Sequence, residues 1–284
     1  MFVRPILLRD TPMIEAMRHF KRPMDVAVFL QSITGLTEEQ VMSLTIGDCV
    51  YILTYLRRLC YTDTPITVTW NCTATVVSSI EFRLELHPDK MNLSEHELNP
   101  LGLHRRTCGR KNTELIYPYA YSFDTHSADW DSIELPEELR VPTLLDAHLI
   151  EEMRDSDDWP KYSSFEKLLL WIKADTVGEK REAIKNVSPD LFVELDSLIK
   201  KCDHGIKISY PLRCSDCDTR HTIVKDLDMY SVLPLVSSES VMNMQYSLLG
   251  QKNVLVTEDT PLQKLLYWYN AYQKDKRDKA NKSK

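Results

Sequence analysis

The stretch ITVTWNC, residues 66–72, decides the fold class of this chain. Apolar residues alternate with polar ones along it, and a period of two predicts a β-strand with one buried face. The residues expected on that face are Ile66, Val68, Trp70 and Cys72. A second alternating run, IEFRLEL at residues 80–86, follows after the short link 73–79. The short link favours an antiparallel hairpin of these two strands.

The same pattern returns late in the chain. The run IKISYPL at residues 206–212 alternates, Cys214–Asp218 makes a turn, and residues 222–227 return. In both halves, helical patterns lead into a strand that ends near a cysteine, which suggests a diverged internal duplication. We therefore predict an α+β protein with helical segments and two antiparallel β-hairpins.

Helical patterns precede both hairpins. Thr37–Gln40 has the spacing of a capping box and predicts the start of a short helix. Apolar residues three and four apart predict a helix over residues 48–60, with Cys49 and Cys60 in its core face. A helical segment is expected over residues 143–201. The later helix starts expected are Thr143, a capping box at Ser163–Glu166, Ser188 with Pro189, and an amphipathic helix from Leu262.

These patterns suggest three parts along the chain. Residues 1–135 hold the N-terminal helices, the first hairpin and an irregular excursion from His87 to Asn112; residues 136–273 hold the helical segment, the second hairpin and a C-terminal helix. Residues 274–284 form a basic tail that is expected to be disordered. The alternating run at residues 115–123 contains Pro118, so we expect an edge strand or an extended arm there.

Composition excludes several classes of protein. With 43% apolar and 27% charged residues, the 284-residue chain resembles ordinary globular proteins, and only seven glycines argue against a glycine-rich phosphate-binding fold. Apolar runs such as Leu168–Ile172 are far shorter than the roughly 20 residues of a membrane span. The apolar block within residues 1–10 is too short for a secretory signal, so we expect a cytoplasmic start. Seven scattered cysteines favour reduced thiols.

The net charge of −7 is distributed unevenly along the chain. Residues 274–284 carry six basic and two acidic side chains, so the rest of the chain carries −11. Affinity for nucleic acid comes mainly from neutralising phosphates with basic side chains. The acidic body of the chain therefore argues against nucleic acid as a partner.

One spacing has the character of a metal site, the C-x-x-C formed by Cys214 and Cys217 at the tip of the second hairpin. A structural zinc ion needs four ligands. His221 is close enough to be a third, which gives Cys214, Cys217 and His221 as candidate metal ligands. Cys72 could contribute if the two hairpin tips meet. The default interpretation is a pair of reduced thiols that binds no cofactor, because this ligand set is incomplete.

Other residues near the two hairpins are not expected to supply the missing metal ligands. Cys202 and His204 are expected to lie too far from the tip, because an extended strand rises about 3.3 Å per residue. Thr75 stands where a second cysteine would complete a knuckle in the first hairpin.

No motif predicts catalysis. The chain lacks G-x-S-x-G, a P-loop and a dinucleotide fingerprint. The acidic residues within 155–158 lack the glycine and the closing glutamate of a cation-binding loop, so we interpret them as a solvated helix end. His96, His126 and His148 have no nucleophile at a recognisable spacing. We expect that the protein is not an enzyme.

The order of several short pieces resembles a known family. The pieces are Gly35–Thr37 leading into Leu44–Asp48, the helix YILTYLRRLCY at residues 51–61, the strand end Thr69–Cys72, Asp203–Gly205, and the Cys214–Cys217 turn. This order, from about Phe20 to Val236, resembles the baseplate hub proteins of T-even-type contractile bacteriophages. Relatives in that family often show paired cysteines in the first hairpin, where this chain has only Cys72.

The resemblance implies a viral protein that acts in tail assembly through protein–protein interactions. Its partners would be other phage tail and baseplate hub proteins, and it would act in the host cytoplasm during assembly or in the virion tail baseplate. No catalytic residues come with the resemblance. The interface anchors expected are Tyr117, Tyr119, Tyr121 and the segment 237–250. The alternative is a zinc-ribbon protein associated with nucleic acid, which Cys214, Cys217 and the basic tail favour.

Overall fold

The computed structural model describes residues 3–61, 64–79, 103–117, 122–126, 135–187, 193, 197, 205–226, 228–234, 236–252 and 254–282. The fold class is α+β, as predicted. The chain forms two compact units, each built from segments that are far apart in sequence. Unit 1 comprises Met1–Thr62, Thr125–Ile206 and Asp226–Lys284, and unit 2 comprises Asp63–Asp124 and Lys207–Lys225. Unit 2 thus joins segments from both sides of the boundary that the sequence suggested at residue 135.

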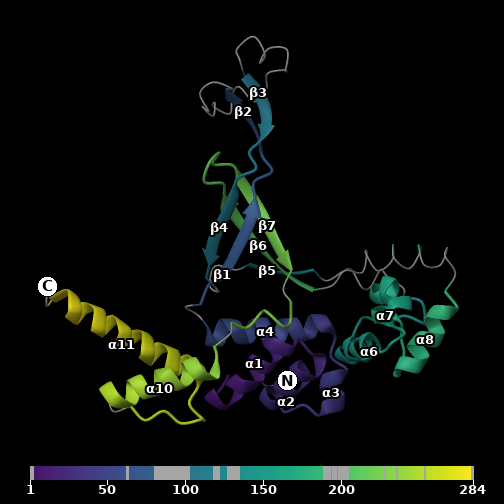
Figure 1. Cartoon of the computed structure of the whole chain (residues 1–284), viewed down its shortest axis with the longest axis horizontal. Helices are drawn as coiled ribbons and strands as arrows, with labels where there is room; N and C mark the ends of the chain where they lie inside the picture. The colour runs from purple at the N-terminus through teal and green to yellow at the C-terminus, as the bar shows by residue number, and fades with distance from the viewer. Residues whose placement is uncertain are drawn as a thin grey trace. The chain divides into compact units, whose positions relative to one another are not determined.

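The N-terminal helices form the first part of unit 1 (Figure 1). They are the 3₁₀ turn η1 (Leu8–Asp10), α1 (Thr11–Phe20), α2 (Pro23–Thr34), α3 (Glu38–Met42) and α4 (Ile46–Cys60). Capping boxes at Thr37 and Thr45 begin α3 and α4, and Gly35 ends α2 with a φ of 70°. The capping box at Thr37 and the buried Cys49 and Cys60 are confirmed.

A second helical group of unit 1 follows Arg140. It consists of α6 (Leu144–Arg154), the 3₁₀ turns η6 (Trp159–Lys161) and η7 (Ser163–Phe165), α7 (Glu166–Trp171) and α8 (Val177–Lys185). The helix start at Thr143 is confirmed by a capping box. The capping box expected at Ser163 was wrong: its hydroxyl turns back to the carbonyl of Pro160, and α7 begins without a side-chain cap. The helix expected from Ser188 falls almost entirely outside the described residues.

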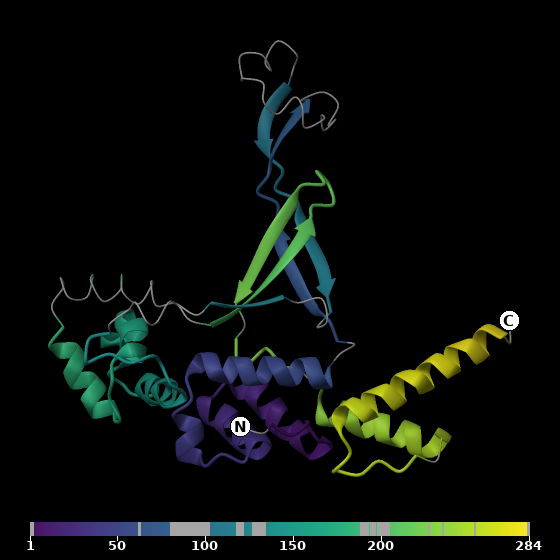
Figure 2. The same cartoon turned by 180° about the vertical axis from the view of Figure 1, so that it is seen from behind.

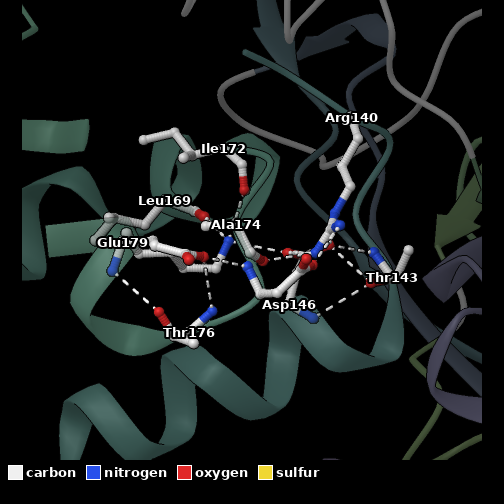
Figure 3. A network of polar contacts seen from close by, with 10 residues as sticks. Arg140, Thr143, Asp146, Leu169, Ile172, Ala174, Thr176 and Glu179 are labelled. Atoms are coloured by element: carbon white, nitrogen blue, oxygen red, sulfur yellow. Dashed lines mark hydrogen bonds and ion pairs between the residues drawn. The ribbon is translucent and has the colours of Figure 1, made fainter. Parts of the chain in front are cut away.

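A network of polar contacts around Asp146 ties the helices of this group together (Figure 3). The Lys180 side chain of α8 is fully buried. Its ammonium donates hydrogen bonds to the carboxylate of Asp146 at 2.9 Å and to the carbonyl oxygens of Leu169 and Ile172, both at 2.7 Å. All three ammonium hydrogens therefore have an acceptor, which is the condition for burying a charge without a large penalty.

Asp146, at the first turn of α6, is the centre of the same network. Arg140 donates to both of its carboxylate oxygens, at 3.0 and 2.9 Å, and the amide of Thr143 donates at 3.0 Å. Burial raises the pKa of Asp146, but Arg140, Lys180 and Thr143 outweigh it and hold that pKa below its usual value. A lowered pKa adds stability above the unfolded value of about 4, and this contribution is lost as the pH falls through the folded pKa.

The C-terminal helices α10 (Ser238–Lys252) and α11 (Leu262–Lys282) pack against each other within unit 1 (Figure 2). The amphipathic helix expected at Leu262 is confirmed, but it does not give way to a disordered tail. Instead, α11 continues from Lys274 through Lys282. Lysine, arginine and alanine favour helix, and Lys252 forms an ion pair with Asp275 at 2.7 Å.

Unit 2 is built on a long two-stranded ribbon. Its strands are β1 (Ile66–Asn71), β2 (Thr75–Ser79), β3 (Leu103–Thr107) and β4 (Lys111–Ile116). β1 pairs antiparallel with β4, and β2 pairs antiparallel with β3. The alternating burial along β1 is confirmed.

The strand pairing expected for the first hairpin was wrong. Residues 75–79 are a strand, β2, not a turn, because Thr75, Val76 and Val77 have β-branched side chains that favour extended backbone. The partner of β1 is the distant β4, and part of the expected irregular excursion forms β3. The run at residues 80–86, expected as the second strand, lies outside the described residues.

The second hairpin is present. β5 (Ser122–His126), β6 (Gly205–Arg213) and β7 (Arg220–Asp226) form one sheet in that order, and Cys214–Thr219 connects β6 to β7. The run at residues 115–123 enters two strands, with Leu115 in β4 and Phe123 in β5. Both halves share a strand that ends at a cysteine, but the strand pairing that follows differs between them. Among the described residues, no helix is both long and apolar enough to cross a membrane.

Candidate metal centre

Cys72 and Cys108 lie opposite each other in the short breaks of the ribbon, between β1 and β2 on one side and between β3 and β4 on the other. The amide of Cys72 donates to the carbonyl of Arg110 at 2.8 Å, Gly109 donates to Cys72 at 3.0 Å, and Cys108 donates to Ala74 at 2.9 Å. These bonds hold the two strands together between the β1–β4 and β2–β3 pairs. Gly109 has a φ of 68°, a conformation that other residues adopt with strain. The interruption therefore places the Cys72 and Cys108 thiols on neighbouring strands.

The other two cysteines lie in the turn of the β6–β7 hairpin. The amide of Asp218 donates to the carbonyl of Cys214 at 3.0 Å, and the amide of Cys214 donates to Thr219 at 3.0 Å. Asp218 adopts a φ of 52°, which aspartate tolerates better than most residues. This tight turn brings Cys214 and Cys217 to the same side of the hairpin tip.

The four sulfur atoms form one cluster. Those of Cys72 and Cys217 are 3.6 Å apart, those of Cys108 and Cys214 are 3.7 Å apart, and all four lie within 4.8 Å of one another. A zinc ion bound by four thiolates at about 2.3 Å requires sulfur–sulfur distances of about 3.8 Å. A disulfide would require about 2.05 Å. The cluster therefore has the dimensions of a tetrahedral Zn(Cys)₄ site.

Backbone and side-chain donors favour the thiolate form of Cys214. Its burial raises the pKa, but the amides of Cys217 and Asp216 and the side chain of Asn112 outweigh burial and lower that pKa to about 6. Burial raises the pKa of Cys72 to about 12, although the amide of Ala74 opposes this. A divalent cation at the centre would favour the thiolate form of every ligand.

Asn112 links the ribbon to the hairpin behind the sulfur atoms. Its side chain is buried in β4, and its amide nitrogen donates to the carbonyl of Arg110 at 3.1 Å and lies 3.6 Å from the Cys214 sulfur. Its amide oxygen accepts from the backbone and hydroxyl of Ser215, both at 3.0 Å. Such outer contacts fix the orientation of ligands and tune a metal site.

His221 lies beside the cluster, on β7. Its Nε2 is 3.1 Å from the Cys72 sulfur, and its ring packs against Trp70 with centroids 4.7 Å apart. The group of residues whose ligand atoms converge consists of the four cysteines. The structure thus brings together the expected Cys214 and Cys217, the conditional Cys72, and Cys108, which the sequence analysis missed. Cys202 and His204 lie outside the described residues.

The acidic residues within 155–158 lie directly after the end of α6. Asp155, Asp157 and Asp158 are exposed, and Asp158 accepts a hydrogen bond from Lys161 at 2.7 Å. This agrees with the expected solvated helix end.

The interpretation of this centre rests on its geometry, because comparisons of the chain with known proteins found no match. No family model, curated protein or solved structure matches the chain.

Proposed function

We propose that this chain is a non-enzymatic structural or assembly protein of a contractile phage tail baseplate hub, and that one zinc ion bound by four cysteines holds its ribbon and hairpin together. The four converging sulfur atoms of Cys72, Cys108, Cys214 and Cys217 are the observation that carries the structural role. A closed four-thiolate site has no open position for a substrate, which is typical of structural zinc.

The phage assignment rests on the resemblance of the short pieces between about Phe20 and Val236, several of which lie in the first helices. Gly35 and Thr37 lie at the junction of α2 and α3, and Thr45 and Asp48 form the capping box of α4. These residues therefore fix where three helices begin and end.

The helix α10 supplies a surface for partner proteins. It contains residues 238–250 of the expected anchor segment 237–250, and it buries Val241 and Leu248. On its other side, Met242, Tyr246 and Leu249 are 50%, 72% and 48% exposed. Their spacing of four and three places them on one face of the helix. We propose that this face packs against an apolar surface of another tail protein.

Polar substitutions on this face should weaken partner binding without unfolding the protein. The double variant Tyr246→Ser, Leu249→Gln is expected to lose at least about 30-fold in affinity for its hub partner, as for an interface hot spot. The free energy of unfolding should change by less than about 1 kcal/mol, because both side chains are exposed. Affinity would be measured by pull-down and calorimetry with purified tail proteins. Asn243→Ser, an exposed change on the same helix, is the matched control.

Loss of the protein should stop baseplate assembly at the hub while heads continue to form. Electron microscopy of lysates from a nonsense mutant in a nonpermissive host would show this. Full heads without tails are the expected result. Normal infectious tails in the lysate would overturn the assignment to the hub.

A zinc-associated nucleic-acid-binding protein is the second candidate. It is favoured by the exposed basic residues on the ribbon next to the cysteines, namely Arg105, Arg106, Arg110 and Lys111. The acidic remainder of the chain opposes it. Fluorescence anisotropy with labelled RNA and DNA decides between the two. The hub function predicts no binding at physiological salt, whereas tight binding that falls steeply with salt would support the second candidate.

A further inference from the structure

We infer that His221 is a positioning residue of the metal centre: its Nε2–H donates a hydrogen bond to the Cys72 thiolate and thereby slows metal loss. This inference rests on the zinc site proposed above. It assigns to His221 a role different from the ligand role that the sequence suggested.

The distances favour a hydrogen bond over metal ligation. His221 Nε2 is 3.1 Å from the Cys72 sulfur, closer than the 3.6 Å between the Cys72 and Cys217 sulfurs and the 3.7 Å between those of Cys108 and Cys214. The four sulfur atoms lie within 4.8 Å of one another and can supply all four ligands, and structural zinc sites are almost always four-coordinate. A four-coordinate ion leaves no position for His221 as a fifth ligand. His221 can still donate a hydrogen bond to one of the thiolates.

The surroundings keep the ring in place. His221 packs on Trp70, whose side chain is buried at the end of β1, one position before Asn71 and two before Cys72. The contact between these two rings, one from β1 and one from β7, therefore holds the Nε2 atom against the sulfur. The hydrogen bond also ties the hairpin to the ribbon independently of Asn112.

The hydrogen bond from His221 should stabilise the site because it offsets part of the negative charge on the thiolates. Four thiolates around Zn²⁺ carry a net charge of −2, and each donated hydrogen bond reduces the charge on the sulfur that accepts it. Backbone amides already approach the sulfurs of Cys72, Cys108 and Cys214. Cys72 gains a second donor from His221. Without His221, Cys72 should take up a proton or react with an electrophile more readily than it does in the unchanged protein.

Cobalt substitution in the full-length protein tests the role of His221. His221→Phe keeps an aromatic ring against Trp70 but removes the donor, and His221→Gln keeps a side-chain N–H. We expect His221→Phe to bind Co²⁺ with the absorption spectrum of the unchanged four-thiolate site and with about 10–100-fold lower affinity, as for other outer contacts of metal ligands. His221→Gln should recover part of that loss. Thr222→Ala, an exposed neighbour, should match the unchanged protein.

Three outcomes would overturn the inference. A spectrum that changes from three thiolates and one nitrogen to four thiolates on His221→Phe substitution would make His221 a ligand. If the unchanged protein and His221→Phe bind cobalt with equal affinity and their thiols are alkylated at equal rates, His221 has no role at the centre. That result would not contradict the proposed zinc site. Absence of stoichiometric Co²⁺ binding by the unchanged protein would overturn both the inference and the proposed metal site.

Discussion

Removal of the metal is expected to unfold unit 2 while the helices of unit 1 stay folded. The buried apolar side chains described in the strands of unit 2 include Ile66, Val68, Trp70, Val76 and Ile116. An isolated two-stranded ribbon is at best marginally stable in water. Zinc binding by small cysteine-rich domains supplies about 10–16 kcal/mol of apparent free energy, and where the apo form is unfolded this energy drives folding. Hydrogen exchange after chelation should therefore show lost protection in residues 66–79, 103–116 and 209–223.

Replacement of a ligand should have the same effect as chelation. Cys214→Ser with Cys217→Ser is expected to abolish stoichiometric zinc and to expose the ribbon amides. A turn with only two thiols would have tolerated this change, but Cys72 and Cys108 complete the site. Cys49→Ala is the matched control, because this buried cysteine lies in α4 of unit 1 and should leave the zinc content unchanged. Ribbon protection that survives both chelation and the double substitution would contradict the structural role.

Substitution of Lys180 is expected to cost about 3–5 kcal/mol of the free energy of unfolding, the range for breaking a buried ion pair on one side. Lys180→Met would remove one of the partners of Asp146 and would leave the carbonyls of Leu169 and Ile172 without their donor. Chemical denaturation monitored by the fluorescence of Trp171, which is buried in the apolar cluster of α6, α7 and α8, would measure the loss. The effect should be confined to unit 1.

A matched exposed lysine controls for the change of residue type. Lys185→Met, on the same helix, breaks a pair with Glu182 in which both side chains are more than half exposed. Exposed pairs contribute about 0–1 kcal/mol, so Lys185→Met should have a small effect. Equal effects of the two substitutions would contradict the account of the buried network.

Local patterns in the sequence predicted local structure well. Thr37, Thr45 and Thr143 begin helices because each is followed three residues later by a side chain that completes a capping box. The start at Thr45 was not singled out from the sequence, although Asp48 provided the signal. Alternation along β1 predicted its buried face, and the short turn predicted the β6–β7 hairpin. In these elements the signals lie within a few residues of one another.

Strand pairing over long distances was not predictable in the same way. β1 pairs with β4, about 45 residues later, and no periodicity marks that partner. Cys108 was missed for the same reason: it carries no C-x-x-C spacing, and it reaches the cluster only because β3 and β4 return along β1 and β2. Asn112 gave no signal at all. The C-x-x-C of Cys214 and Cys217 could be read directly from the sequence because its two thiols share one turn.

The metal content of the purified full-length protein and of its Cys108→Ser variant tests the central claim most directly. Native mass spectrometry of the unchanged protein should show one zinc ion per chain, and Cys108→Ser should lose it, because Cys108 lies on the ribbon and supplies one of the four sulfurs. A chain without stoichiometric metal, or a zinc ion that Cys108→Ser leaves bound with unchanged affinity, would contradict the four-cysteine centre.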